Sequence, residues 1–427
     1  MPTPAIHRAF LLAAASLAFA TVGPFATAEV PNRPATMLHQ EPVQLEVTVL
    51  SIEEKPGPGP QTTSVWHRVR IERVMSGEGL APGDEIAVIS KTYRVPPGAG
   101  GSRGMRGDFR GPNGLPVKGD RARLFGKGPR DAIQPSFPNG WQPAAPLVAF
   151  VAADDEYRSE ITLPFLAGIA ERTGVVRSSV SLASDPAKPE THDPNAKTGL
   201  TNADRSRWIE ATVAYLRFER LDDRFLKAFL APIEGGLPLV AFRTTTHAFA
   251  YPDGSPNMKW NAGFGERFLG TPWRFHHGHS SRTRILRPEG PPEGEAAAHP
   301  IVAGLEIPKD GLVVPSWLYH VEPLPADCRV LLWGEAVDSE AKDAPKRQPI
   351  VWVRELPRET TDKPAEPARP LPPQRIAVTT LGHPGDFASP EVRLLALRMI
   401  AWATGRELDA KATAEARKAT FDPPPTR

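Results

Sequence analysis

The stretch Leu147-Val-Ala-Phe-Val-Ala152 is a continuous apolar run, and the polar stretch Asp154-Asp-Glu-Tyr157 follows it closely. A second run, Leu237-Pro-Leu-Val-Ala-Phe242, leads in the same way into Arg243-Thr-Thr-Thr-His247. Short apolar runs of this kind are typical of strands that are buried on both faces of a parallel sheet. The two stretches therefore predict an α/β fold with polar groups at the carboxyl ends of its strands.

The residues around these runs alternate between strand and helix patterns. Ser159 is expected to cap a helix that continues through Ile169. Residues 222–233 predict an amphipathic helix that ends at Gly235 and Gly236. Further strands are expected at residues 175–182, 209–216, 329–333, 349–353 and 375–379, with a closing helix at 390–404. Strands that alternate with helices predict a parallel sheet with helices on both faces.

Residues 42–142 show a different pattern, in which apolar and polar residues alternate along short segments. The segments 44–50, 65–71, 83–89 and 120–125 are separated by Gly and Pro turns, which is typical of a small antiparallel barrel or sandwich. The Gly- and Arg-rich residues 98–114 predict a solvated loop, or alternatively one that grips a ligand.

Two segments outside these patterns complete the domain organisation. Residues 355–373 are rich in proline and charge, and they predict a surface insertion in the second domain, which spans 146–406. Residues 407–427 predict a polar tail, formed by a short helix followed by disorder.

The first 28 residues have the pattern of a secretory signal peptide. His7 and Arg8 make a short basic region, residues 9–20 are apolar but short for a bilayer span, and Ala26-Thr27-Ala28 matches a cleavage site. Cleavage after Ala28 would make the mature protein periplasmic or secreted, and an uncleaved anchor is the alternative. We expect no membrane span in the mature chain.

Composition argues against some classes of function. The formal net charge is +2 and the chain has no long Lys or Arg run, so we expect no nucleic-acid partner. The 49 prolines are roughly twice the usual share of about 5%, and most of them punctuate loops. Cys328 is the one cysteine, which excludes an intrachain disulfide. Its apolar surroundings predict a buried structural thiol rather than a nucleophile.

Polar groups that follow expected strands are the first candidates for a site, because ligands bind at the carboxyl ends of parallel strands. The acids 154–156 repel one another, which can prepare a general base, or they complement a helix dipole. His247 is interpreted as a base, a ligand or a sugar-binding donor, with a structural role as the alternative. His383 and Asp386 follow the last strand, as an oriented base or as part of a turn.

Two aromatic segments add further candidates. Trp273-Arg-Phe-His-His-Gly-His279 places three histidines within four residues. If this segment is extended, His277 and His279 face one way and His276 the other, so only two of them could easily share a metal ion. We predict no cofactor and keep zinc as an alternative. Ser316-Trp-Leu-Tyr-His320 combines rings with hydrogen-bonding groups, which suits either a carbohydrate or an aromatic core.

Together with His299-Pro-Ile301 and Thr380-Leu-Gly-His-Pro384, these motifs resemble the ThuA-like (trehalose-utilisation) domain family over roughly residues 146–406. The resemblance implies a flavodoxin-like sheet, similar to class I glutamine amidotransferases, and a ligand related to trehalose or keto-sugars. Those enzymes use a Cys-His-Glu triad. This chain has no cysteine near Thr244, although His383 resembles the position of the triad histidine. We therefore expect no amidotransferase activity.

Two functions are consistent with these residues. The first is an exported enzyme that acts on a sugar by acid–base chemistry, with Glu156, His247 and His383 handling protons; hydrolysis, lyase chemistry and isomerisation are all open. The second is a non-catalytic sugar-binding or scaffolding module. The residues expected to contact the ligand are Asp155, Tyr157, Arg243, His276, His277, Trp317 and His320. The sequence leaves the oligomeric state open.

Overall fold

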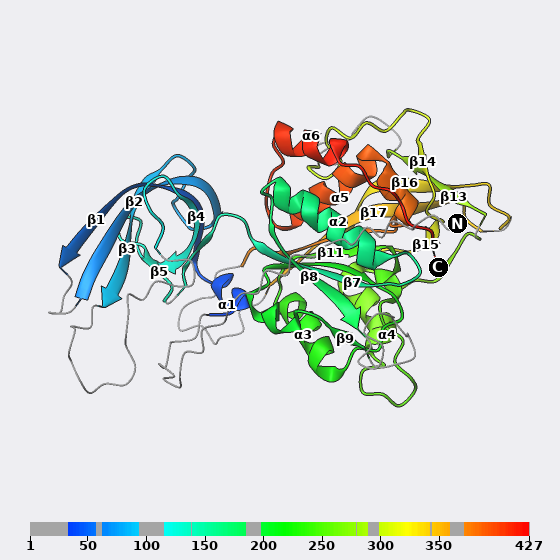
Figure 1. Cartoon of the computed structure of the whole chain (residues 1–427), viewed down its shortest axis with the longest axis horizontal. Coiled ribbons are helices and arrows are strands. Elements are labelled where there is room, and N and C mark those ends of the chain that lie inside the picture. The colour runs from blue at the N-terminus through cyan, green and yellow to red at the C-terminus, as the bar shows by residue number, and fades with distance from the viewer. Residues whose placement is uncertain are drawn as a thin grey trace, which may run out of the picture.

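The computed structural model describes residues 33–56, 62–93, 115–137, 139–184, 198–278, 280–288, 299–341, 344–358 and 371–426. They form a small all-β lobe and a larger α/β lobe (Figure 1). The expected signal peptide, the 98–114 insertion, His279 and most of the 355–373 insertion lie outside the described residues.

The small lobe is a curved antiparallel sheet with the form of a half-barrel. Its strand order is β3-β2-β1-β4-β5, and β6 pairs with β4. The inward side chains of β1, Leu45, Val47 and Val49, are buried in one core. Ile133 bridges to β3 and so draws the two edges of the sheet together. The strands are β1 (Val43–Pro56), β2 (Thr62–Ser76), β3 (Glu85–Tyr93), β4 (Arg121–Lys127), β5 (Gln134–Pro135) and β6 (Trp141–Pro143), after the short helix α1 (Ala35–Leu38).

The large lobe is built on a ten-stranded mixed sheet with the order β14-β13-β16-β17-β18-β11-β10-β7-β8-β9. The strands from β18 to β8 in this order run parallel to one another, and the remaining strands pair antiparallel. The bounds are β7 (Leu147–Ala153), β8 (Arg177–Ser184), β9 (Gly199–Leu200), β10 (Ala211–Leu216), β11 (Leu239–Phe242), β13 (Arg282–Leu286), β14 (Leu312–Val314), β16 (Cys328–Val337), β17 (Arg347–Leu356) and β18 (Gln374–Thr379).

The expectation of a parallel sheet throughout is therefore wrong for one side of this sheet. β16 and β17 are joined by residues 338–346, a connection too short for the crossover that parallel neighbours require. The chain turns back as a hairpin instead, and β13 and β14 extend the sheet in the same antiparallel manner. A separate pair, β12 (Phe275–His276) and β15 (Tyr319–His320), is also antiparallel.

Helices cover both faces of the large sheet (Figure 1). Val148 and Phe150 of β7 belong to the core on one face, whereas Ala149 and Val151 belong to the core on the other. A strand covered on both faces needs apolar residues at every position, which explains the unbroken run in the sequence. One face carries α2 (Ser159–Arg172), α5 (Pro390–Ala403) and α6 (Ala410–Lys418), and the other carries α3 (Asp223–Glu234) and α4 (Trp260–Phe264).

Two local expectations are corrected. Ser159 is the first residue of α2 rather than its cap, and its hydroxyl group binds the backbone of Asp154. The chain after α6 is packed rather than disordered, because the ring of Phe421 lies on that of Phe165, with 4.6 Å between their centroids. These residues therefore extend the core of the large lobe.

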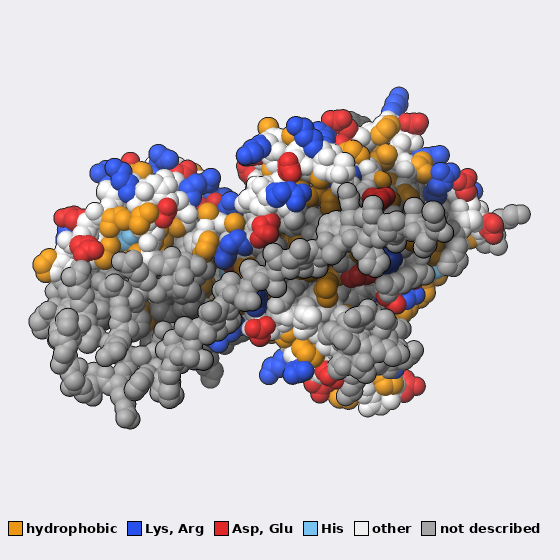
Figure 2. All heavy atoms as spheres, viewed as in Figure 1, with side chains coloured by type: hydrophobic (Ala, Val, Ile, Leu, Met, Phe, Trp, Pro, Cys, Tyr) orange, Lys and Arg blue, Asp and Glu red, His pale blue; other side chains and the backbone are white. Residues whose placement is uncertain are grey.

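The described surface carries both signs of charge. Acidic and basic side chains are interspersed over the described part of the face shown in Figure 2. Within the described ranges, no helix combines the length and the apolar character that crossing a lipid bilayer demands.

A buried ion pair joins the two lobes. Arg123 of β4 and Glu210, which precedes β10, have side chains only 3% and 7% exposed. Both carboxylate oxygens of Glu210 accept hydrogen bonds from Arg123, and one also accepts the backbone N–H of Leu147. Burial alone would raise the pKa of Glu210, but Arg123 and a hydrogen bond from His39 outweigh it and hold that pKa well below its usual range.

Replacing Arg123 would leave the Glu210 carboxylate buried without a counter-charge. We expect Arg123→Ala to lower the free energy of unfolding by about 3–5 kcal/mol, which urea denaturation followed by circular dichroism would measure. The control Arg68→Ala breaks an exposed pair with Glu85 and should cost less than about 1 kcal/mol. Equal losses for the two variants would contradict the importance of this ion pair.

Candidate functional site

Polar side chains from several elements meet at the carboxyl edge of the parallel strands. β7, β10, β11 and β18 all end at this edge because they run in the same direction. Ring contacts, ion pairs and hydrogen bonds link the side chains that gather there. We call this group the carboxyl-edge cluster: Asp154, Glu156, Tyr157, Arg217, Arg243, His247, His276, Trp317, Tyr319 and His383.

Arg243 lies at the centre of the carboxyl-edge cluster and is fully buried. Its guanidinium carbon is 4.2 Å from the ring centroid of Tyr157 and 4.6 Å from that of Tyr319. Nη1 donates to the hydroxyl group of Ser316 at 3.0 Å and to the carbonyl of Thr380 at 3.1 Å. Nε and Nη2 have no hydrogen-bond partner among the described residues. Aromatic rings and neutral oxygens therefore surround this buried cation.

Arg243 also occupies an unusual backbone turn. It begins the 3-10 helix η2 (Arg243–His247) directly after β11, with a φ of +41° that non-glycine residues seldom adopt. Some hydrolases place their nucleophile on a sharp strand-to-helix turn of this kind, but a guanidinium stays protonated and does not act as one. Cys328 lies elsewhere, in β16, and burial raises the pKa of its thiol to about 11, which disfavours the reactive thiolate.

Asp154 is the buried acid of the cluster; the sequence placed it among the three acids that could prepare a general base, but not among the residues assigned to catalysis or ligand contact. Its side chain is 2% exposed, Oδ1 accepts the backbone N–H of Tyr157 at 2.9 Å, and Oδ2 accepts the hydroxyl group of Thr244. Burial raises the pKa of Asp154 to about 7, although these hydrogen bonds lower it. The available signal was its position one residue after β7, where the burial of the strand continues.

Glu156 lies at the rim of the carboxyl-edge cluster, with a side chain 20% exposed. One of its oxygens is 2.5 Å from Nη2 of Arg217, so this ion pair joins the ends of β7 and β10. Asp155 beside it is half-buried, and its carboxylate makes no ion pair or hydrogen bond with the described residues. Of the two acids predicted at this position, Glu156 is the one held by a partner.

Two histidines of the cluster differ in depth. Nδ1 of His383 accepts the backbone N–H of Gly385 at 3.0 Å, so the proton of the neutral ring is on Nε2. Its ring is half-buried, 6.2 Å from that of Tyr157, and burial lowers its pKa. His247 is 8% exposed between the rings of Phe218 and Trp273, and burial lowers its pKa well below the usual value. Both rings are therefore neutral at pH 7.

The β12–β15 pair places His276 on one side and His277 and His320 on the other. His276 and Tyr319 are opposite each other in the register, and the ring of His276 lies 5.1 Å from that of Trp317. His276 and Trp317 are half-buried, whereas Tyr319 is buried against Arg243. His276, Tyr319 and Trp317 thus belong to the carboxyl-edge cluster.

His277 and His320 are not brought to the carboxyl-edge cluster. Nδ1 of His277 is 2.6 Å from the hydroxyl oxygen of Ser339, and its Nε2 is 3.0 Å from the carbonyl oxygen of Pro345 and from Nε2 of His320. His320 also stacks on Phe275, with 3.8 Å between the ring centroids. Within the described ranges, no three His, Cys, Asp or Glu side chains are grouped so that they could hold a metal ion.

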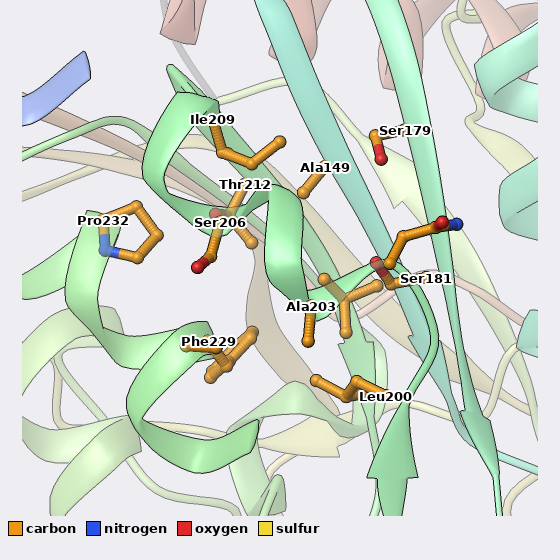
Figure 3. A pocket seen from close by; sticks show the side chains of 13 residues that line it. Ala149, Ser179, Ser181, Leu200, Ala203, Ser206, Ile209, Thr212, Phe229 and Pro232 are labelled. Carbon is orange, nitrogen blue, oxygen red and sulfur yellow. The ribbon is translucent and has the colours of Figure 1, made fainter. Parts of the chain in front are cut away.

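A separate cavity of about 30 Å³ lies between β7, β8 and α3 (Figure 3). Its lining is largely apolar, with the hydroxyl groups of Ser179, Ser181 and Ser206 among the side chains shown. The hydroxyl group of Ser179 has no hydrogen-bond partner among the described residues. The volume suits a single water molecule and is too small for a sugar ring.

Comparisons with known proteins give a distant similarity among solved structures. No protein-family profile and no curated protein match the chain. Among solved structures, the chain is similar to a protein from Parabacteroides merdae described as ThuA-like, with 15% sequence identity and a TM-score of 0.40. The similarity covers 62% of this chain and 92% of that chain. A likeness this distant gives no information on ligand or reaction.

The raised pKa of Asp154 predicts the direction in which the stability of the protein changes with pH. Between about pH 4 and pH 7 an unfolded aspartate is ionised while the buried one keeps its proton, so wild-type stability falls as pH rises. Asp154→Asn keeps the size of the side chain and removes this titration. We expect the stability of the variant relative to wild type to increase by roughly 1–4 kcal/mol from pH 4 to pH 8 in urea denaturation.

Glu160→Gln on α2 is the matched control, because that side chain is 33% exposed. Its stability relative to wild type should change little over the same pH range. A constant difference between Asp154→Asn and wild type from pH 4 to pH 8 would refute the raised pKa.

Proposed function

We propose that this protein is an exported ThuA-like protein that acts on a carbohydrate, related to trehalose or keto-sugars, by acid–base chemistry without a cysteine nucleophile. The observation that carries the proposal is the convergence of Glu156, His276, Trp317 and His383 around the buried Arg243. These four side chains come from separate segments and are all partly exposed. The family resemblance supplies the substrate class, and the signal-like residues 1–28 supply the export.

We also propose that the parallel strands form a flavodoxin-like sheet in a domain of residues 146–406, preceded by a β domain of residues 42–142. In chain order the strands are β7, β8, β10, β11 and β18, and across the sheet they read 2-1-3-4-5, which is the flavodoxin-like order. Ligands of such folds bind where the order reverses, which here is between β7 and β10. The Glu156–Arg217 ion pair joins the ends of these two strands.

Recognition of a sugar is assigned to the half-buried side chains of the rim. A sugar ring has apolar faces and polar edges, so the Trp317 ring would cover a face while His276 and Glu156 bind hydroxyl groups. Tyr157 and Arg243 are buried, with exposed fractions of 2% and 0%. We therefore assign them to holding the rim in place rather than to direct contact with the ligand.

Proton transfer is assigned to the two sides of the same rim. The Glu156 carboxylate would accept a proton from the substrate, and Nε2–H of His383 would donate a hydrogen bond to an oxygen that gains negative charge. The neutral ring of His247 is the proposed second proton carrier. The scheme uses no cofactor, so stoichiometric zinc in the purified protein would contradict it.

A non-catalytic carbohydrate-binding module is the second candidate. The observation that favours it is Arg243 on the turn after β11, where a hydrolase of related topology could carry a nucleophile. In this case the same rim would bind the sugar and release it unchanged.

Turnover and binding separate the two candidates. The mature protein would be incubated with trehalose, other disaccharides and their 3-keto derivatives, with products followed by chromatography and binding by calorimetry. For an enzyme, we expect Glu156→Gln to lower kcat by roughly 10²–10⁴-fold, because it removes the base, and to leave the melting temperature unchanged. Glu160→Gln removes the same charge nearby and should keep full activity. Saturable binding without turnover would establish the binding module, and neither binding nor turnover would contradict both.

Trp317 should contribute to affinity in either case. We expect Trp317→Ala to weaken sugar binding roughly 10-fold, equal to about 1.4 kcal/mol, since it removes the apolar surface that meets the sugar face. Trp208→Ala, in the 3-10 helix η1 (Ala203–Trp208), should leave the affinity unchanged. Calorimetric titration measures both, and equal affinities for Trp317→Ala and wild type would remove Trp317 from the proposed site.

A further inference from the structure

A cavity of about 280 Å³ lies between the two lobes, at the opposite edge of the sheet from the carboxyl-edge cluster. Pro146, Glu210, Pro238 and Pro373 line it, and these residues directly or closely precede β7, β10, β11 and β18. Strands β1 and β2 of the small lobe line its other side. We call this space the interlobe cavity, and it is distinct from the proposed sugar site.

The charges that line the interlobe cavity are mostly positive. Its two carboxylates already have arginine partners: Glu210 is paired with Arg123, and Glu46 accepts hydrogen bonds from Arg73 and Arg406. Five arginines against two glutamates leave three positive charges, because burial lowers the pKa of His39 and keeps its ring neutral. The lining arginines are Arg73, Arg123, Arg358, Arg375 and Arg406.

Several guanidinium nitrogens of the interlobe cavity lack partners. Nε and Nη2 of Arg358 and Nε of Arg73 are buried atoms without a hydrogen-bond partner among the described residues. Arg358 makes no ion pair with a described carboxylate, and Arg375 is 3.6 Å from the half-exposed Glu355. Buried donors without partners are costly, and an oxyanion in the cavity would satisfy them.

Two glycines allow these guanidinium groups to approach the backbone. A Cβ atom at Gly405 would lie 3.2 Å from Nη1 of Arg73 and 3.7 Å from Nη1 of Arg375. A Cβ atom at Gly236 would lie 2.6 Å from Nε of Arg358, which is too close. Arg73 of the small lobe and Arg375 of the large lobe therefore converge on the same point at Gly405.

We propose that the interlobe cavity binds a small molecule that carries a phosphate group, held by Arg73, Arg358 and Arg375. The planar guanidinium fork matches the geometry of phosphate oxygens, and a dianion suits three excess charges better than a single carboxylate does. The cavity has room for more than the phosphate alone, so an ester fits. Because both lobes contribute arginines, the bound molecule would tie them together and raise the melting temperature.

The test uses the mature chain with inorganic phosphate and glucose 6-phosphate as probes, at constant ionic strength. Calorimetry should show one saturable site for each probe, and the melting temperature should rise with probe concentration. We expect Arg358→Gln to weaken binding at least 10-fold and Arg358→Lys to weaken it less, because lysine keeps the charge. Circular dichroism would show that the variants are folded.

The matched control is Arg172→Gln, which removes an arginine of α2 that is 56% exposed. It should leave phosphate affinity unchanged. If Arg172→Gln weakened phosphate binding as much as Arg358→Gln does, the loss would reflect the net charge of the protein alone, and the proposed site would be overturned. The proposal would also be overturned by a lack of saturable phosphate binding, or by unchanged binding in both Arg358→Gln and Arg375→Gln. Tighter binding of citrate than of either phosphate probe would overturn the choice of phosphate.

Discussion

The buried guanidinium of Arg243 constrains the geometry of the whole carboxyl edge. Removing a cation from water costs several kcal/mol unless other groups replace the lost hydration. Here the replacement comes from the rings of Tyr157 and Tyr319, the hydroxyl group of Ser316 and the carbonyl of Thr380. These groups belong to segments that follow β7 and β18 and to the segment around β15, so all of them must be in place together.

The carboxylate of Asp386 stabilises this arrangement through Ser316, without contacting Arg243 itself. Oδ2 of Asp386 is 2.5 Å from the hydroxyl oxygen of Ser316, and the other oxygen of Asp386 accepts the backbone N–H of Ser316. Ser316 therefore lies between the buried cation and the buried anion. Ser316 precedes Trp317 in the chain, so this network helps to hold the rim in place. The buried residues Arg243, Ser316 and Asp386 therefore support the proposed sugar site without contacting the sugar themselves.

The two edges of the parallel strands have different chemistry. The carboxyl edge combines aromatic rings with acids and histidines, and the large lobe alone forms it. The opposite edge is covered by the small lobe through the Arg123–Glu210 ion pair, and excess arginines line the space between them. The small lobe therefore has no part in the proposed sugar site, and it completes the proposed phosphate site.

The sequence by itself determined the parallel strands of the α/β lobe, the helices α2, α3 and α5, and the place where polar groups gather. A strand buried on both faces requires an unbroken apolar run, and this requirement is local, so it is readable at β7 and β11 without coordinates. The positions of Glu156 and His383 after their strands were readable for the same reason, whereas the alternation in β1 did not show that Gln44 and Glu46 are buried beside its apolar residues.

Only the tertiary structure decided which polar groups meet. Asp154 and Thr244 are 90 residues apart in the chain, and the hydrogen bond between them lowers the pKa of Asp154 while burial raises it. The pairing of β12 with β15 placed His276 beside Trp317 and Tyr319 and placed His277 beside Ser339, although the two histidines are adjacent. The antiparallel side of the sheet depended on a hairpin between β16 and β17. These outcomes depend on contacts between distant segments, which no local pattern of residues contains.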